Sequence, residues 1–252
     1  MLLRAVVIYA LVFLALMAPY WVFTWWRYLP SALVIVGLVA LERGRRWPDW
    51  LGLRIPPLHA LAALALLAAT AFGTEALKVF LAGRQGVSFL KVSWDWGGAI
   101  VTVSQAVNQE MVLRALVLNF LSLKLRSGAY ASLLVAAIFA LGHWIFYATV
   151  DHAILSATTV STLFVFMLVG NMLFVSFGHI AFPLALHVGW NFGKFSAPYL
   201  PRGGRSFFEE YEAFNFLEGS PFTLALALVL LGISWAVVRA QAERRAAAPG
   251  TG

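Results

Sequence analysis

Cysteine is absent from this chain of 252 residues, so disulfide bonds, thiol nucleophiles and cysteine-ligated metals are excluded. Charge is also scarce: Asp, Glu, Lys and Arg make up 12% of the residues, against about 25% in soluble domains. The sequence shows no basic patch with the base- or groove-reading features of a nucleic-acid-binding protein. With 62% hydrophobic residues, the composition predicts an integral membrane protein that has a lipid bilayer, and no nucleic acid, as its partner.

Apolar runs long enough to cross a bilayer recur along the chain and predict an all-α, polytopic bundle of about eight transmembrane helices. We expect a single transmembrane domain over 1–239, with its motif-bearing core at about 97–197, and a disordered cytoplasmic tail over 240–252. The expected spans are 4–24, 30–42, 58–82, 97–121, 129–150, 157–176, 179–197 and 221–239.

The loops on the side that holds both termini carry more Lys and Arg than the loops on the other side, which favours cytoplasmic termini. The lack of cysteine and the Ala-, Leu- and Arg-rich composition are typical of a prokaryotic protein. The sequence therefore predicts a protein of the bacterial inner (cytoplasmic) membrane.

Two charged residues lie inside the expected span 97–121, which is otherwise largely apolar. Glu110 and Arg114 are four residues apart, so a helix places them on one face, where each offsets part of the other's cost. An ionised side chain near a bilayer centre costs about 2.5–3.5 kcal/mol on insertion scales. A buried ion pair that only fixes helix packing is one explanation of this cost, and catalysis is the other.

Three more polar residues occur at membrane depth, on two other expected spans. His143 lies in 129–150, and His187 and Asn191 lie four apart, hence on one helix face, in 179–197. Ionisable residues on three helices at one depth are expected to meet in the bundle interior. Each could serve alone as an interhelical hydrogen-bonding residue, but their coincidence with Glu110 favours a functional site.

A carboxylate and an imidazole that converge on one water can deprotonate it, and a second His with an Asn can stabilise the resulting oxyanion. Glu110, His143, His187 and Asn191 therefore predict hydrolysis of a peptide bond without a cofactor. Glu110, His143 and His187 also form a feasible zinc site, although the HExxH signature is absent. A transporter with a proton relay ranks last, because no inverted repeat or pair of broken helices is visible.

The three motifs, in their order along the chain, resemble those of the CPBP family of CAAX prenyl endopeptidases and bacteriocin-processing (Abi-type) enzymes. The family pattern is Glu-Glu-x-x-x-Arg, Phe-x-x-x-His and His-x-x-x-Asn on separate helices. It is found here at 109–114, 139–143 and 187–191, with one substitution. The resemblance implies a glutamate-dependent intramembrane endopeptidase. The carboxylate and His143 would activate water, and His187 with Asn191 would form the oxyanion site.

The substitution is Gln109, which stands where the family has its first Glu, generally taken as the water-activating residue. A neutral amide cannot act as a general base. Either Glu110 has taken over that role, with Arg114 and Gln109 as supporting residues, or the chain is a degenerate member that acts as a membrane binding or immunity protein. We favour activity because the other motif residues remain, and we expect membrane-anchored or amphipathic proteins or peptides as substrates.

Overall fold

The computed structural model describes residues 37, 39–40, 46–84, 96–150, 152–195 and 215–247, and these residues form helices and connecting turns without a β-strand. The all-α membrane bundle predicted from the sequence is therefore confirmed. The expected span 4–24 and most of 30–42 lie outside the described residues, so the total of about eight spans stays a prediction.

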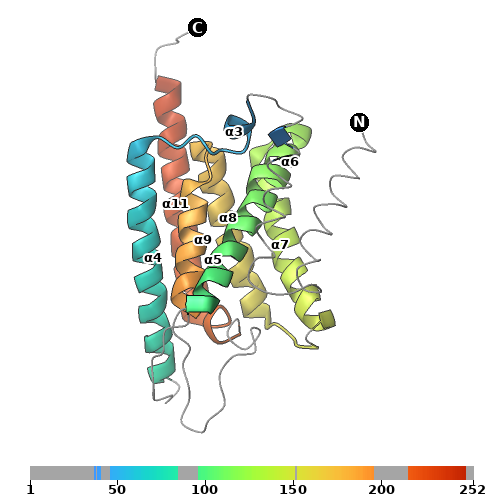
Figure 1. Ribbon diagram of the computed structural model, residues 1–252, viewed down its shortest axis with the longest axis vertical. Helices are drawn as coiled ribbons and strands as arrows, with labels where there is room; N and C mark the ends of the chain where they lie inside the picture. The colour runs from blue at the N-terminus through green and yellow to red at the C-terminus, as the bar shows by residue number, and fades with distance from the viewer. Residues whose placement is uncertain are drawn as a thin grey trace. The chain divides into compact units, whose positions relative to one another are not determined.

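The described elements run in chain order along the sequence (Figure 1). They are α3 (Trp47–Trp50), α4 (Pro57–Arg84), α5 (Trp96–Glu110), the π-helix η3 (Met111–Leu118), α6 (Asn119–Leu125), α7 (Gly128–Val150), α8 (Ala157–Phe177), α9 (Ala181–Phe195) and α11 (Pro221–Ala247).

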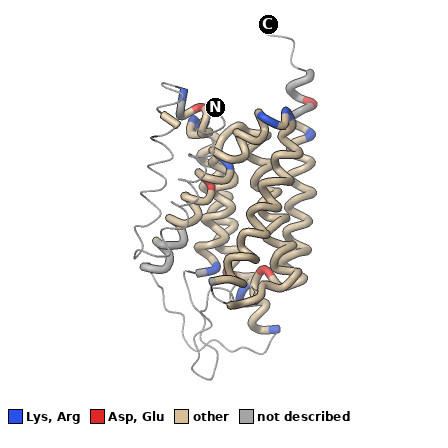
Figure 2. Tube along the Cα trace, turned by 90° about the vertical axis from the view of Figure 1, so that its right-hand side faces the viewer, with Lys and Arg blue, Asp and Glu red and all other residues tan. Residues whose placement is uncertain are grey.

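Four stretches of the described chain are long and apolar enough to cross a membrane. They are Pro57–Arg84, Gly128–Thr149, Ala157–Phe177 and Pro221–Gln241, and each overlaps a predicted span. Figure 2 shows these helices with long uncharged stretches between their charged residues.

Two predicted spans differ from the observed helices. The span expected at 97–121 is one helical path made of α5, η3 and α6, with a π-helix in its middle. The span expected at 179–197 contains α9, which begins at Ala181 and is described as far as Phe195. The later start of α9 has a local cause: Gly178 ends α8 with a φ of 71°, and a bend precedes α9.

The C-terminal helix is longer than predicted. Helix α11 runs to Ala247, and Arg239 Nε lies 3.0 Å from Glu243 Oε1 one turn further on. The disordered tail predicted over 240–252 is therefore corrected for 240–247, because a run rich in Ala, Arg and Glu has high helix propensity and continues the helix. Residues 248–252 lie outside the described part of the chain.

The chain divides into two compact units. The first consists of Met1–Thr74, Ser93–Phe120 and His179–Ala197, and the second of Glu75–Val92, Leu121–Gly178 and Pro198–Gly252. The first unit thus holds α3, the first part of α4, α5, η3 and α9. The single domain predicted over 1–239 and its core at 97–197 stay predictions.

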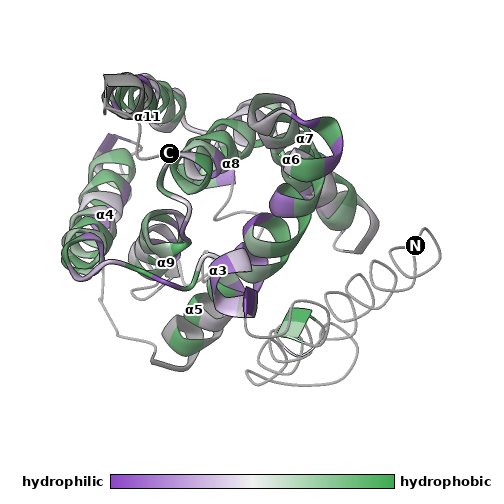
Figure 3. Cartoon of the chain, turned by 90° about the horizontal axis from the view of Figure 1, so that it is seen from above, coloured by the Kyte–Doolittle hydropathy of each residue, from purple (hydrophilic) through white to green (hydrophobic). Residues whose placement is uncertain are grey.

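In the first unit, α9 packs closely on α4 through small residues at every fourth position, namely Ala181, Ala185, Gly189 and Gly193. Ala181 and Ala185 form a buried cluster with Ala63 of α4. A Cβ atom on Gly189 would lie 2.6 Å from the carbonyl oxygen of Leu67, so a larger residue cannot fit there without a shift. Helix α5 also packs on α9, and Figure 3 shows the order α4, α9, α5.

In the second unit, α8 packs against both α7 and α11. Tyr147 and Ala140 of α7 bury a cluster with Leu155 and Leu163. The carboxamide of Asn171, which is fully buried, donates a hydrogen bond of 2.9 Å to the carbonyl oxygen of Ser132. This bond connects α8 to α7 at membrane depth.

Candidate active site

Glu110 lies at the junction of α5 and η3 in the first unit, and its side chain is 0% exposed. The eight residues that follow, Met111–Leu118, form a π-helix, in which backbone hydrogen bonds skip one residue more than in an α-helix. Such segments are rare and occur frequently at functional sites. The π-helix begins directly after the carboxylate that the sequence analysis singled out.

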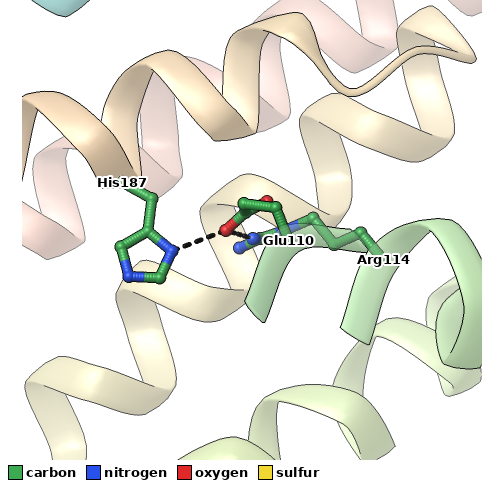
Figure 4. Close-up of polar contacts among 3 residues, drawn as sticks. All are labelled: Glu110, Arg114 and His187. Carbon is green, nitrogen blue, oxygen red and sulfur yellow. Dashed lines mark hydrogen bonds and ion pairs between the residues drawn. The ribbon is translucent and has the colours of Figure 1, made fainter. Parts of the chain in front are cut away.

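Arg114 lies within this π-helix, and its guanidinium donates a hydrogen bond to Oε1 of Glu110 (Figure 4). Both side chains are buried. Removal of two charges from water costs several kcal/mol each, and the pair offsets this cost by mutual attraction. The pairing of Glu110 with Arg114 expected from their spacing is present in the structure.

His187 reaches the same oxygen from a different helix. Its Nδ1 atom, carried by α9, lies 2.7 Å from Oε1 of Glu110 (Figure 4). A carboxylate only accepts hydrogen bonds, so Nδ1 carries the proton and donates it. The Nε2 atom of His187 can then donate a second hydrogen bond only when the ring holds both protons. Figure 4 shows the imidazole and the guanidinium meeting at one carboxylate oxygen.

The second carboxylate oxygen has different surroundings. Oε2 of Glu110 is buried and has no hydrogen-bond partner among the described residues, whereas Oε1 is bound by two donors. An unsatisfied buried acceptor costs about 1–3 kcal/mol, so its presence calls for an explanation. A water molecule bound at Oε2 would satisfy it, and the carboxylate could then take a proton from that water.

The remaining predicted residues fall in both units. Asn191 lies on α9 one turn after His187, on the same face, and is partly buried, as is Gln109 on α5. His143 lies on α7 in the second unit, where its Nδ1 atom donates to the carbonyl oxygen of Phe139 at 2.9 Å. The meeting of His143 with Glu110 therefore stays a prediction.

The zinc site predicted from the sequence requires Glu110, His143 and His187 together. Within the first unit, one carboxylate and one imidazole lie together, and the guanidinium of Arg114 contacts the same carboxylate, where it would repel a divalent cation. The described residues contain no group of three His, Cys, Asp or Glu side chains that could hold a metal ion. The predicted zinc site also needs His143, which lies in the second unit, so the zinc alternative stays a prediction.

The close packing of α9 on α4, on the side of α9 away from His187, was not predicted from the sequence. On α9, Gly189 and Gly193 lie about 200° round the helix from His187 and Asn191, respectively, so one face bears the polar residues and the opposite face contacts α4. The signal was present in the sequence as small residues at 181, 185, 189 and 193, a small-xxx-small pattern typical of close helix contacts.

Fold and site together define an all-α integral membrane protein with a buried Glu–Arg–His cluster in its first unit. Residues 91–193 match the family model described as "Type II CAAX prenyl endopeptidase Rce1-like", which confirms the resemblance to the CPBP family. The matched segment contains all three motifs. At the level of the family, this supports a membrane endopeptidase, a class of hydrolase. No curated protein and no solved structure matches the chain.

Proposed function

We propose that this chain is an intramembrane endopeptidase in which Glu110 activates the attacking water. The observation that carries the proposal is the asymmetry of the Glu110 carboxylate, with Oε1 bound by Arg114 and His187 and Oε2 buried without a partner among the described residues. The two donors hold the carboxylate in one rotamer. The second oxygen is left to accept from a water molecule.

In the proposed reaction, Oε2 of Glu110 takes a proton from water as the water oxygen bonds to the peptide carbonyl carbon. The carbonyl oxygen becomes an oxyanion, which the Asn191 carboxamide stabilises by donating a hydrogen bond. The C–N bond then breaks, and the proton held by Glu110 passes to the leaving nitrogen. The products are a carboxylic acid and an amine, so one water is consumed for each bond cut.

The family resemblance implies that His187 helps to form the oxyanion site, and we propose instead that it chiefly positions Glu110. With Nδ1 donating to Glu110, only Nε2 is available for an oxyanion, and it donates only in the doubly protonated ring. Asn191 donates in every protonation state, so we assign it the main oxyanion role. His187 chiefly positions Glu110, and His143 is proposed as the second group at the water.

Gln109 motivates a second candidate function, a membrane binding or immunity protein that retains the fold without cutting. In that case the site would bind a membrane-anchored or amphipathic peptide and leave it intact. Gln109→Glu distinguishes the two candidates. A large gain of cleavage from a silent parent would indicate a degenerate enzyme, whereas an active parent with a modest response supports Glu110 as the base.

The test in cells is a comparison of membrane-protein termini in a strain that expresses the native chain and in one that expresses Glu110→Gln. The proposal expects new termini that depend on Glu110 and that also disappear with Asn191→Ala and His143→Ala. A control strain carries Arg54→Gln, which changes an exposed residue outside the proposed site. Identical termini in the native and Glu110→Gln strains would refute the enzyme proposal.

A further inference from the structure

A single side chain spans the end of the π-helix. The backbone N–H of Asn119 bonds to the carbonyl oxygens of Arg114 and Leu116, so it passes over the one that an α-helix would use, that of Ala115. The carboxamide Nδ2 of Asn119 donates to Ala115 instead, at 3.1 Å. In an α-helix the backbone N–H of Asn119 would bond to the carbonyl oxygen of Ala115. In this π-helix the Asn119 side chain makes that bond instead.

The same nitrogen makes a second hydrogen bond, to a segment far away in the sequence. Asn119 Nδ2 lies 2.6 Å from the carbonyl oxygen of Trp50, at the end of α3. A carboxamide nitrogen carries two protons, and these two carbonyls account for both. Asn119 therefore links the π-helix to α3, and both protons of its carboxamide nitrogen are used in hydrogen bonds.

The segment that receives this bond, residues 47–53, also binds the beginning of α9. We call it the 47–53 turn. Gly52 has a φ of 67°, a left-handed conformation that favours glycine, and its carbonyl oxygen accepts a hydrogen bond of 2.9 Å from the N–H of Ile180. Leu51 is fully buried, and Leu53 N–H donates to the carbonyl oxygen of Pro48 at 2.8 Å. The turn is an ordered part of the first unit.

These bonds bring the 47–53 turn into contact with both chain segments that build the Glu110–His187 contact. One segment is η3, which follows Glu110 and contains Arg114. The other is α9, in which His187 lies two turns after Ile180. A slip of η3 from π to α geometry would rotate Glu110 relative to Arg114 and α9, and the Asn119 bonds oppose such a slip.

We propose that Asn119 is a positioning residue for Glu110: its carboxamide fixes the end of the π-helix against the 47–53 turn and so sets the rotation at which the carboxylate meets His187. Asn119 itself touches no reacting atom. This inference rests on the proposed function for its kinetic consequence, whereas its structural consequence can be measured without activity.

The variants separate the two hydrogen bonds. Asn119→Asp keeps the shape and removes both donors, and Asn119→Ala removes the whole carboxamide. Asn119→Ser places a hydroxyl that can reach the carbonyl of Ala115 on its own helix but not that of Trp50. The matched control is Ser122→Ala on the same helix, which deletes a buried hydroxyl that has no hydrogen-bond partner among the described residues.

Two readouts are taken on the full-length chain in lipid nanodiscs. The first is amide hydrogen exchange in peptides that cover 111–118 and 47–53. The proposal expects at least tenfold faster exchange in both for Asn119→Ala and Asn119→Asp, faster exchange confined to 47–53 for Asn119→Ser, and no change for Ser122→Ala. Exchange in Asn119→Ala equal to that of the native chain would overturn the proposal.

The second readout is steady-state cleavage of a peptide substrate found by terminal proteomics. Misplacement of Glu110 lowers kcat by about tenfold or more with KM nearly unchanged, in the order native, Ser, then Ala and Asp. If the Asn119 variants only lowered the amount of folded protein, kcat per folded molecule would stay constant. That result would overturn the positioning role. If the native chain cuts nothing but exchange responds as expected, the proposed function fails while the Asn119 linkage stands.

Discussion

Nδ1 of His187 lies 2.7 Å from Oε1 of Glu110, although the two residues are separated by 77 positions in the sequence. The contact joins the end of α5 to the middle of α9, and it is completed by Arg114 at the same oxygen. Both donors use Oε1, and in the proposed function Oε2 is the oxygen that takes a proton from water. The predictions that follow depend on this division.

The first prediction concerns the buried charge of Glu110. Arg114→Leu leaves the carboxylate without its guanidinium and should destabilise the protein by about 3–5 kcal/mol, the usual cost of breaking a buried pair. The double variant Glu110→Gln with Arg114→Leu should recover most of that stability and remain inactive. Thermal unfolding in detergent micelles measures the change.

The control for Arg114 is Arg54, whose Nε atom lies 2.9 Å from Asp49 with both side chains exposed. Arg54→Leu should cost less than about 1 kcal/mol, since surface pairs contribute little. Equal losses in Arg114→Leu and Arg54→Leu would contradict the buried pairing of Glu110.

The second prediction concerns the close packing of α9 on α4. A Cβ atom on Gly193 would lie 2.5 Å from the carbonyl oxygen of Ala71, so Gly193→Ala must move one helix and should cost about 1–3 kcal/mol. Because α9 carries His187, cleavage should fall as well. Unfolding temperature and kcat are measured together.

The matched control is Gly73→Ala, in α4, where an added Cβ has no atom within 4 Å. This variant should be neutral or gain up to about 1 kcal/mol, because Ala favours a helix over Gly. A Gly193→Ala protein as stable as Gly73→Ala would show that the two helices are not in contact at that position.

The third prediction concerns pH. His179 lies in the bend between α8 and α9. Its Nε2 atom is 2.8 Å from Nδ1 of His59. Burial, and then the nearby His59 ring, lowers the pKa of His179 below its ordinary value of 6.5. Below pH 6.5 and above the folded-state pKa, the unfolded chain binds more protons than the folded one, so the free energy of unfolding falls as the pH falls.

Unfolding temperatures recorded between pH 5 and pH 8 should therefore drop below about pH 6.5 in the native chain, and the drop should shrink in His179→Gln. The exposed His152 supplies the comparison: His152→Asn keeps a residue tolerant of its positive φ, and its unfolding temperatures are recorded beside those of His179→Gln. An unchanged drop in His179→Gln would contradict the burial of His179 as its cause.

Much of this site could be predicted from spacing alone. The pairing of Glu110 with Arg114 follows from helix geometry, and the meeting of Glu110 with His187 follows from the cost of an ionisable group in lipid. The π-helix could not be predicted, because residues 111–118 have ordinary helix-forming side chains and the contact of Asn119 with Trp50 joins segments far apart in the sequence.

Two errors have similar physical origins. The disordered tail was placed too early because a loss of hydrophobicity after residue 239 ends a membrane span without ending a helix. The seventh span was predicted to begin at residue 179, whereas α9 begins at Ala181, because hydropathy does not register the bend at 178–180. Hydropathy indicates whether a segment lies in lipid or in water, whereas backbone geometry decides where its helix begins and ends.

The central claim is that Glu110, and not Gln109, supplies the base. Its most direct test is the single-turnover cleavage rate in proteoliposomes of the native chain, Glu110→Gln, Gln109→Glu and the double variant Gln109→Glu with Glu110→Gln. We predict that Glu110→Gln loses about 10²–10⁴-fold in rate, the usual contribution of a general base, and that Gln109→Glu does not restore it in the double variant. Full activity of Glu110→Gln, with the protein folded, would contradict the account.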